Sequence, residues 1–256
     1  MPRRTAATEK RSLIEAINVT SAITAYRAAI RARKRRAFVT TYALTMAIST
    51  MLTANARAID IKIVDDPGGK AVTILLTGQI VDGDALRVRG SIGSIDASKS
   101  IIVQLGFAGG RTAEALSIGR LLHQTQIRTT VPARARCLSP CPLVLVGGCD
   151  PVTEKPSCIK YSSAALGFTS FKLDMPESNY TVADLDNTVS NVQRTILWVA
   201  DYLRDVGADL NMLKYYLSAQ RPNEAKYITN EQALDLGIAV ISEQTGQLIE
   251  PKKRRR

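Results

Sequence analysis

Residues 103–122 read VQLGFAGGRTAEALSIGRLL and carry the signals that decide the fold class of this chain. The stretch begins inside an apolar run, residues 100–105, whose length and flanking turn residues are typical of a buried parallel strand. Gly109 and Gly110 mark a turn after it. A helix is predicted over 112–126, because its apolar residues recur at intervals of three and four. Strand, glycine turn and amphipathic helix in this order predict one unit of an α/β fold.

The same alternation continues on both sides of this unit. Strands are predicted at 59–64, 71–80, 128–131, 227–228 and 238–241, and a hairpin at 158–168. Helices are predicted after Ser139-Pro140 as far as Gly147, and at 181–204, 210–217 and 231–236. The alternation of strands and helices predicts one α/β domain over residues 59–243 with a mostly parallel sheet.

Charge is unevenly distributed along the chain. Of 34 Lys and Arg and 23 Asp and Glu, the first 58 residues hold 11 and 2, and the last five residues are all basic. The remaining body holds 18 basic and 21 acidic residues and is mildly acidic, so no nucleic-acid partner is expected for it. The single histidine, His123, excludes a metal site built from several histidines, and no metal or cofactor is expected.

Residues 37–54, AFVTTYALTMAISTMLTA, carry no charge and follow the basic run 31–36. They precede Ala56-Arg57-Ala58, a small-residue pattern at which signal peptides are cut. The sequence therefore predicts a basic extension over 1–36, a signal peptide or uncleaved anchor over 37–58, and a basic flexible tail over 244–256. Cleavage would place the domain in the periplasm or outside the cell, with its first residue near Ile59. An uncleaved segment 37–54 would anchor it in the inner membrane.

Four cysteines, Cys137, Cys141, Cys149 and Cys158, lie within 22 residues. An even number in an exported protein favours disulfides. The stretch between Cys149 and Cys158 has a proline near each end and reads as a loop whose ends meet, so these two are expected to be bonded. Cys137 is then left to bond Cys141 across one irregular turn. A four-cysteine zinc site and four small buried side chains stay open as alternatives.

Two further segments complete an ordered set of motifs. Residues 137–141 read CLSPC and lead into an apolar stretch, and residues 226–240 read KYITNEQALDLGIAV. Together with 103–122 they resemble the proteolytic subunit of Clp protease and the wider Clp/crotonase fold. The likeness is greater to exported bacterial proteins of that fold with a GG-x-x-x-EAL-x-IGR segment followed by C-x-S-x-C, and it spans residues 70–243. The resemblance implies repeated β-β-α units with a mostly parallel sheet and helices packed outside it.

The resemblance also implies roles for individual residues. Ser139 matches the nucleophilic serine, which stands at the start of a helix where first-turn N–H groups stabilise an anion. The loop of Gly109 and Gly110 matches the loop that donates one N–H group to the oxyanion, and the residue after the serine donates the other. A base is implied at 167–169, and an orienting acid near 226–227.

This chain departs from the family pattern at each supporting position. Pro140 follows the serine and has no backbone N–H to donate. Thr169 stands where the histidine is expected, and Ala225 falls at the position of the acid. Phe107, in the loop before Gly109, is expected to fill space that a substrate would occupy. These departures predict a degenerate serine-hydrolase site without appreciable peptide hydrolysis.

Other assignments of the same residues stay open. Ser139 also fits a structural role as the N-cap of the following helix, with Pro140 at its first position. A serine–lysine dyad would preserve catalysis, because a desolvated lysine can accept a proton. Lys172 is the best-placed base for such a dyad, Lys160 is the second candidate, and His123 is a relocated base. Each of the three also fits an ordinary side chain with no catalytic role.

Three functions are consistent with these features. The first is an exported Clp-protease-like protein that acts by binding or assembly, with an envelope protein or a peptide as ligand. The second is a serine peptidase or esterase that uses Ser139 and Lys172, and the third is a leader-anchored protein of an envelope complex. Proteins of the resembled fold form trimers or larger rings. Helix 211–220 carries more apolar surface than one side of a helix can bury in its own subunit. Some of that surface is expected to lie at a subunit interface, so a homo-oligomer is expected.

Overall fold

The structure is a computed structural model, and it describes residues 58–169, 180–218 and 224–251. Residues 56–256 form one compact unit. The uncharged stretch 37–54, predicted to be a signal peptide or anchor, lies outside the described residues. Within the three described ranges, no helix combines the length and the apolar character needed to cross a bilayer.

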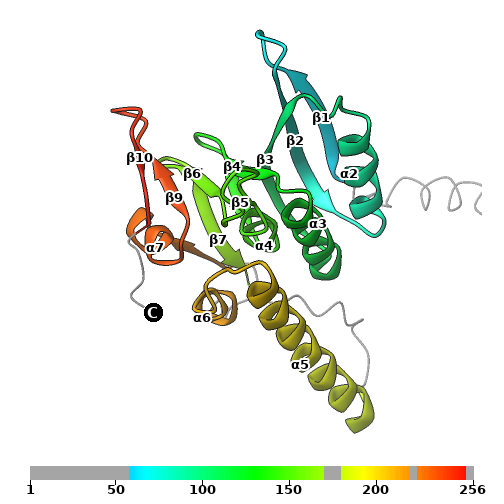
Figure 1. The fold of residues 1–256 in the computed structure, drawn as a ribbon. Coiled ribbons are helices and arrows are strands. Elements are labelled where there is room, and N and C mark those ends of the chain that lie inside the picture. Colours follow the sequence, from blue (N-terminus) through cyan, green and yellow to red (C-terminus); the bar gives the residue numbers. More distant parts are fainter. Residues whose placement is uncertain (1–57, 170–179, 219–223, 252–256) are drawn as a thin grey trace, which may run out of the picture. The chain divides into compact units, whose positions relative to one another are not determined.

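The main sheet has seven strands in the order β1-β2-β3-β4-β6-β9-β10 (Figure 1). Every pairing between β2 and β9 is parallel, and the two outer strands β1 and β10 pair antiparallel. The prediction of an α/β fold with a mostly parallel sheet is therefore confirmed. The strands are β1 Asp60–Asp65, β2 Ala71–Ile80, β3 Ser100–Gly110, β4 Arg128–Val131, β6 Cys158–Tyr161, β9 Ala239–Ile241 and β10 Leu248–Ile249.

A second sheet of three strands has the order β5-β7-β8. Its strands are β5 Arg136–Leu138, β7 Ala165–Thr169 and β8 Ala225–Ile228. The hairpin predicted at 158–168 is wrong, because β6 belongs to the main sheet and β7 to the small one. The short turn between them carries the chain from one sheet to the other, so each strand pairs with more distant segments. β7 pairs parallel with β5 and antiparallel with β8.

Five helices lie within a few residues of the predicted ranges, and a sixth begins where Asp82-Gly83-Asp84 mark the opening of a short helical stretch in the sequence. They are α2 Asp84–Gly93, α3 Thr112–Gln124, α4 Cys141–Leu145, α5 Val182–Asp205, α6 Met212–Ser218 and α7 Asn230–Asp235. Two of them begin with a complete capping box: Thr181 with Asp184 in α5, and Thr229 with Gln232 in α7. Each box satisfies backbone N–H groups of the first turn and so fixes where the helix begins.

The core lies between the main sheet and the helices α2, α3 and α4, which lie along one face of it (Figure 1). Alternate residues of β2, Val72, Ile74 and Leu76, are buried on this face, as a half-buried strand requires. The alternation leaves the other face of β2 partly open. That face carries Leu75 and Thr77 and lines a cleft described below.

Helices α3 and α4 approach closely through two glycines. A Cβ atom on Gly147 would collide with the backbone of Gly119, and one on Gly119 would collide with the ring hydroxyl of Tyr202. The Tyr202 hydroxyl reaches across and donates a hydrogen bond of 2.6 Å to the carbonyl of Leu143. Glycine at these two positions therefore allows α3, α4 and α5 to pack without a gap.

Two boundary predictions need correction. The strand predicted at 100–105 continues to Gly110, because β3 stays paired with β2 as far as Ile80. Residues 248–249, expected in a flexible tail that starts at 244, form β10 and pair with Ile241 and Val240 of β9. Two apolar residues, Leu248 and Ile249, give this segment its strand character despite its polar surroundings.

Candidate functional site

Ser139 lies in the short connection between β5, which ends at Leu138, and α4, which begins at Cys141. The side chain is half-buried, whereas its neighbours Leu138 and Pro140 are buried. Two parts of the chain far away in sequence reach this residue. The backbone N–H of Gly109 donates to the Ser139 carbonyl at 2.9 Å, and the backbone N–H of Thr169 donates to Ser139 Oγ at 3.2 Å.

Ala225 completes the group on the small sheet. It is the direct antiparallel partner of Thr169 in the β7–β8 ladder. The structure therefore brings together Ser139, Thr169 and Ala225, the residues that match the positions of nucleophile, base and acid. A threonine hydroxyl does not accept a proton near neutral pH, and an alanine has no polar group. A backbone hydrogen bond and a ladder pairing join these three residues, and neither Thr169 nor Ala225 supplies a group for proton transfer.

Ser139 does not cap the helix that follows it. The N-cap of α4 is Pro140, and no side chain caps this end. The N-cap prediction for Ser139 is therefore wrong. The serine Oγ instead accepts the Thr169 N–H and so joins the connection to the end of β7.

The oxyanion donors implied by the resemblance are largely committed elsewhere. Pro140 has no N–H, and the N–H of Gly109 already donates to the Ser139 carbonyl. Gly110 has a positive φ of 119°, and a Cβ on it would collide with the backbone of Ile80. The glycine pair is thus required by the close pairing of β3 with β2.

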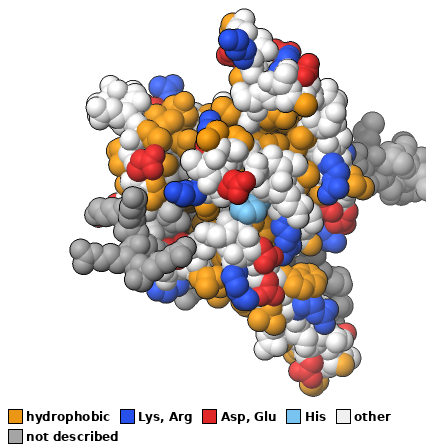
Figure 2. Space-filling view, viewed as in Figure 1, with side chains coloured by type: hydrophobic (Ala, Val, Ile, Leu, Met, Phe, Trp, Pro, Cys, Tyr) orange, Lys and Arg blue, Asp and Glu red, His pale blue; other side chains and the backbone are white. Residues whose placement is uncertain are grey.

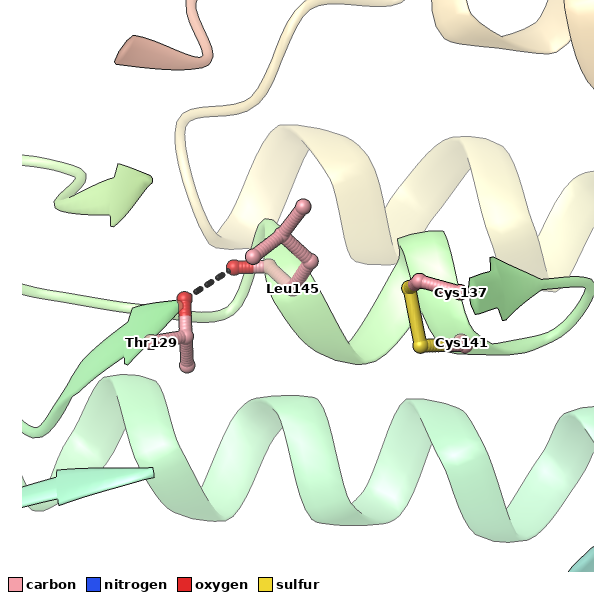
Figure 3. Close-up of a disulfide and its surroundings, with 4 residues drawn as sticks. All are labelled: Thr129, Cys137, Cys141 and Leu145. Atoms are coloured by element: carbon pink, nitrogen blue, oxygen red, sulfur yellow. Dashed lines mark hydrogen bonds between the residues drawn. A yellow bond between two sulfur atoms is a disulfide. The ribbon is translucent and has the colours of Figure 1, made fainter. Parts of the chain in front are cut away.

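A disulfide bond joins Cys137 and Cys141, two residues before and two residues after Ser139 (Figure 3). Both cysteines are fully buried. The bond ties the end of β5 to the first residue of α4 and confines the connection that holds Ser139. At the other end of α4, Thr129 of β4 donates its hydroxyl to the Leu145 carbonyl at 2.6 Å (Figure 3). Both ends of this five-residue helix are therefore fixed to strands.

The expected bond between Cys149 and Cys158 is wrong, because both are free, buried thiols. The loop between them does close, as predicted, but its register places Pro156 opposite Cys149. Cys158 begins β6 two residues later, and its sulfur lies 3.7 Å from the Gly237 carbonyl. Burial raises the pKa of the Cys158 thiol to about 12, and burial together with the Asp150 carboxylate raises the pKa of Cys149.

Three residues are candidate bases for Ser139, and the structure describes two of them, Lys160 and His123. Lys172 lies outside the described residues. Lys160 is 1% exposed in the middle of β6, and its ammonium group donates to the side-chain oxygen of Asn230 at the start of α7. Burial lowers the pKa of Lys160, although Glu243 opposes the effect.

His123 belongs to the last turn of α3, whereas Ser139 contacts the loop before the first turn. Eleven residues of α-helix separate Thr112 from His123, a rise of about 16 Å. His123 therefore cannot serve as a base for Ser139. The pale-blue histidine stands at the surface in Figure 2, although its Nδ1 atom is buried without a partner.

A cleft of about 600 Å³ opens next to the site. Its floor is the face of β2 and β3 that the helices leave uncovered, and its wall is the connection between β4 and β5. Gln79 lies at one end of the cleft and packs against Gly109, with its Nε2 atom 3.4 Å from the position of a Cβ there. The lining residues are mainly apolar, with a few polar ends: Leu75, Thr77, Gly78, Gln79, Gln104, Leu105, Gly106, Phe107, Ala108, Pro132, Ala135 and Arg136.

Phe107, expected to fill space that a substrate would occupy, borders the cleft, but its side chain is 2% exposed and belongs to the hydrophobic core. Strand alternation accounts for Leu75, Thr77 and Gln79, the odd-numbered residues of β2 that line the cleft. Beyond the Gln104–Thr130 pair, β3 has no further pairing with β4. Because β3 and β4 move apart beyond this pair, the connection between β4 and β5 has room to form the wall of the cleft. The separation depends on two strands distant in sequence, so no local pattern in the sequence predicts it.

The described residues contain no group of three or more His, Cys, Asp or Glu side chains placed to hold a metal ion. No protein-family model matches this chain, and no curated protein matches it in sequence.

Proposed function

We propose that this chain is an exported protein of the Clp/crotonase-like fold, with a degenerate serine-hydrolase site, that acts by binding or assembly. The observation that carries the proposal is the adjacency of Ser139, Thr169 and Ala225. The resemblance places a nucleophile, a base and an acid at these three positions. Of the three residues, the serine alone retains a functional group suited to hydrolysis.

The surroundings of Ser139 support a loss of catalysis. A nucleophilic serine needs a base to remove its proton, and its oxyanion needs free N–H donors. Here a backbone N–H donates to the Ser139 hydroxyl, and the nearby Gly109 N–H donates to a carbonyl of the chain itself. Loss of one oxyanion donor typically costs about 10²–10³ in rate. Loss of the base is enough by itself to predict near-inactivity, and the two losses are not additive because the residues of a triad act as a unit.

The cleft beside Gly109 is the proposed binding site. A mainly apolar floor with a few polar side-chain groups suits an extended peptide. The side chains of such a peptide need apolar contacts, and its backbone needs hydrogen bonds. Gln79 and Gln104 supply side-chain amides that both donate and accept. An extended segment of an envelope protein or a free peptide is the proposed ligand.

Assembly is proposed through α5 and not through α6. The helix α6, expected to have surplus apolar surface, buries Met212 and Tyr216 within its own chain, and its Tyr215 stacks on Phe168. In α5, by contrast, Val182 is 75% exposed, Leu185 50% and Val189 55%. Hydrophobic side chains stand among polar and charged ones on the exposed part of this helix in Figure 2.

Five apolar residues of α5, exposed or half-buried, follow a regular pattern. They are Val182, Leu185, Val189, Val192 and Ile196, spaced alternately by three and four residues, the spacing of helices that pair with one another. Leu197 and Trp198 are also exposed and lie off this pattern. The same stripe continues into Val199 and Leu203, which are buried in the chain's own core. The flanking Thr188, Gln193 and Thr195 carry no charge. We propose that α5 of a second copy of the chain packs against this row of apolar residues.

Charge favours an antiparallel arrangement of the two helices. Asp184 and Asp186 lie in the first turns of α5, and Arg194 lies two turns further on. A parallel pair would bring four carboxylates together at one end. An antiparallel pair places the carboxylates of each helix near the Arg194 of the other and also pairs the helix dipoles favourably.

Labelling with a fluorophosphonate probe tests the catalytic half of the proposal. The wild-type chain should show no labelling at Ser139 above the Ser139→Ala background, and Pro140→Ala should show none either, because it restores a donor but no base. Thr169→His with Ala225→Asp should raise labelling, since it supplies a base and an acid at adjacent positions. Labelling of wild type that both Ser139→Ala and Lys172→Ala abolish would establish the serine–lysine hydrolase instead.

Peptide binding tests the other half. Ala108 lines the cleft, and Ala113 is exposed in the first turn of α3. With a library of fluorescently labelled peptides, Ala108→Trp should abolish anisotropy changes, because the indole fills the cleft. Ala113→Trp should leave them unchanged. Equal binding by both variants would remove the cleft from the proposal.

A further inference from the structure

The main chain of Ile59 is held on both sides by the first turn of α2. Its backbone N–H donates to Asp84 Oδ2 at 3.2 Å, and its carbonyl accepts from Arg87 Nη1 at 2.9 Å. The side chain of Ile59 is 0% exposed, whereas Ala58, the preceding residue, is exposed. Burial therefore begins between Ala58 and Ile59, and the backbone nitrogen of Ile59 lies against the carboxylate of Asp84.

Asp84 is a fully buried carboxylate with 0% exposure. Its Oδ2 also accepts the Val81 N–H at 2.7 Å, and its Oδ1 pairs with Arg87 at 2.7 Å. The Arg87 side chain is about half exposed, so water screens part of its charge. Burial of a carboxylate is costly unless opposite charge and hydrogen bonds surround it, so this site favours a further cation.

A second carboxylate lies at the same end of α2. Glu114 of α3 accepts the Ala85 N–H at 2.9 Å. The nearby pair Asp82–Arg111 is exposed and balances its own charge. Two carboxylates therefore lie at this end of α2, and the Arg87 guanidinium pairs with that of Asp84. A positive charge at the Ile59 nitrogen would place a second cation directly against the buried Asp84.

We propose that the chain is cut between Ala58 and Ile59 and that the new α-ammonium group of Ile59 forms a buried ion pair with Asp84. Hydrolysis adds one water: Ala58 leaves with the carboxylate, and Ile59 retains the amine, which takes up a proton. An endopeptidase acting in trans carries out this step. Because Ile59 is buried in the fold, cleavage precedes folding, after which the ammonium occupies the position of the present amide nitrogen.

The proposal rests on the export proposed above and does not depend on the role of Ser139. The sequence Ala56-Arg57-Ala58 is the small-residue pattern that such endopeptidases cut, and the buried nitrogen that donates to Asp84 is a separate observation. The buried core described here lies wholly between Ile59 and Val240, so a chain that starts at Ile59 retains it.

Two chains that differ by one residue provide a matched test. One begins at Ile59 and the other at Ala58, which moves the ammonium group out to an exposed residue. At pH 6.5 the chain that begins at Ile59 should melt roughly 5 °C higher, because a charge-assisted hydrogen bond replaces a neutral one. Pairing with Asp84 raises the pKa of the α-amino group above its usual value of about 8. The advantage is therefore full below that pH and is lost as the pH rises through the raised pKa.

Amine reactivity gives a second readout. An aldehyde reagent selective for α-amino groups should label the chain that begins at Ala58 at least about tenfold faster than the one that begins at Ile59, because only the second amine is buried and paired. In an Asp84→Asn background the difference in melting temperature should vanish. If that variant does not fold, the pH dependence and the labelling rates still decide the matter.

Three results would overturn the proposal. The first is equal melting temperature and equal labelling of the two chains. The second is an advantage of the Ile59 chain that persists unchanged at high pH, since a neutral amine cannot form the ion pair. The third is a protein purified from its native cells whose N-terminal residue lies before Ile59. A start at Ile59 with both expected differences establishes the ion pair.

Discussion

At the scale of single residues, Ser139 has a physical role that does not require catalysis. Its hydroxyl accepts the Thr169 N–H and its carbonyl accepts the Gly109 N–H, so one residue links the β5–α4 connection to two distant strands. The same two contacts occupy the groups that a serine hydrolase would keep free for its substrate. The hydrogen bonds that hold the connection in place therefore use the groups that catalysis would need. They favour a structural role for Ser139 over a catalytic one.

We predict that Ser139→Ala lowers the free energy of unfolding by about 1 kcal/mol, because the half-buried N–H of Thr169 loses its acceptor. Denaturant titration of the two proteins measures this difference. Ser94→Ala is the matched control: its hydroxyl donates to a backbone carbonyl at an exposed helix end, so its removal should cost less than about 0.5 kcal/mol. Equal effects of the two variants would show that Ser139 does not support the connection.

The cysteines yield a second prediction at this scale. Cys149 and Cys158 should resist alkylation by iodoacetamide at pH 8 in the folded protein and react fully after unfolding. With a pKa of about 12, Cys158 holds only about one thiolate in ten thousand at that pH, and the thiolate is the reactive form. Mapping of peptides under non-reducing conditions should recover Cys137 linked to Cys141. A linked Cys149–Cys158 peptide would contradict this assignment.

At the scale of elements, close approaches of backbone decide which helices can pack. The contact between α3 and the turn after α4 depends on Gly119 and Gly147, where no Cβ fits. Gly110 serves the same purpose between β2 and β3. Such glycines occur at crossings of elements, so their importance is not visible in the local helix or strand pattern.

The same substitution at two glycines should have opposite effects on stability. Gly147→Ala should destabilise the protein by about 1–3 kcal/mol or more, because the new methyl group meets fixed backbone of Gly119. Gly90→Ala, in the middle of α2 with open space around it, should stabilise by about 0.5–1 kcal/mol through lower backbone entropy of the unfolded chain. Thermal unfolding of both variants measures the two changes in stability. A loss of stability at Gly90 would mean that α2 is packed on that side.

At the scale of the whole molecule, the exposed stripe of α5 predicts self-association. The full-length chain should scatter light as a dimer or larger assembly at micromolar concentration, and Val189→Asp should reduce its mass to that of a monomer, since a carboxylate cannot be buried in an apolar helix pair. Val152→Asp places the same change at a valine that is 83% exposed in a loop, and it should leave the mass unchanged.

Cysteine crosslinking tests the direction of the pair. In an antiparallel pair, Leu185 of one helix lies opposite Ile196 of the other, so a mixture of Leu185→Cys and Ile196→Cys chains should crosslink while neither does so alone. A monomeric wild type would contradict self-association. A mass that Val189→Asp does not change would move the interface away from α5.

Sequence alone determined the parts of this protein that depend on neighbours in the chain. The apolar period of 181–204 predicted α5, and the order of strands and helices predicted an α/β fold with a mostly parallel sheet. These features are local, because a period is complete within a few residues.

The tertiary structure decided what depends on pairing between distant segments. Three outcomes could not be read locally: β6 and β7 separate into two sheets, Cys149 meets Pro156 and not Cys158, and Ser139 accepts a hydrogen bond from Thr169 and caps no helix. A change of register by two residues decides the second outcome, and the sequence carries no record of register between strands far apart in the chain. The adjacency of Ser139, Thr169 and Ala225 likewise arises only when the loop before α4 and the ladder of β7 and β8 come together in space.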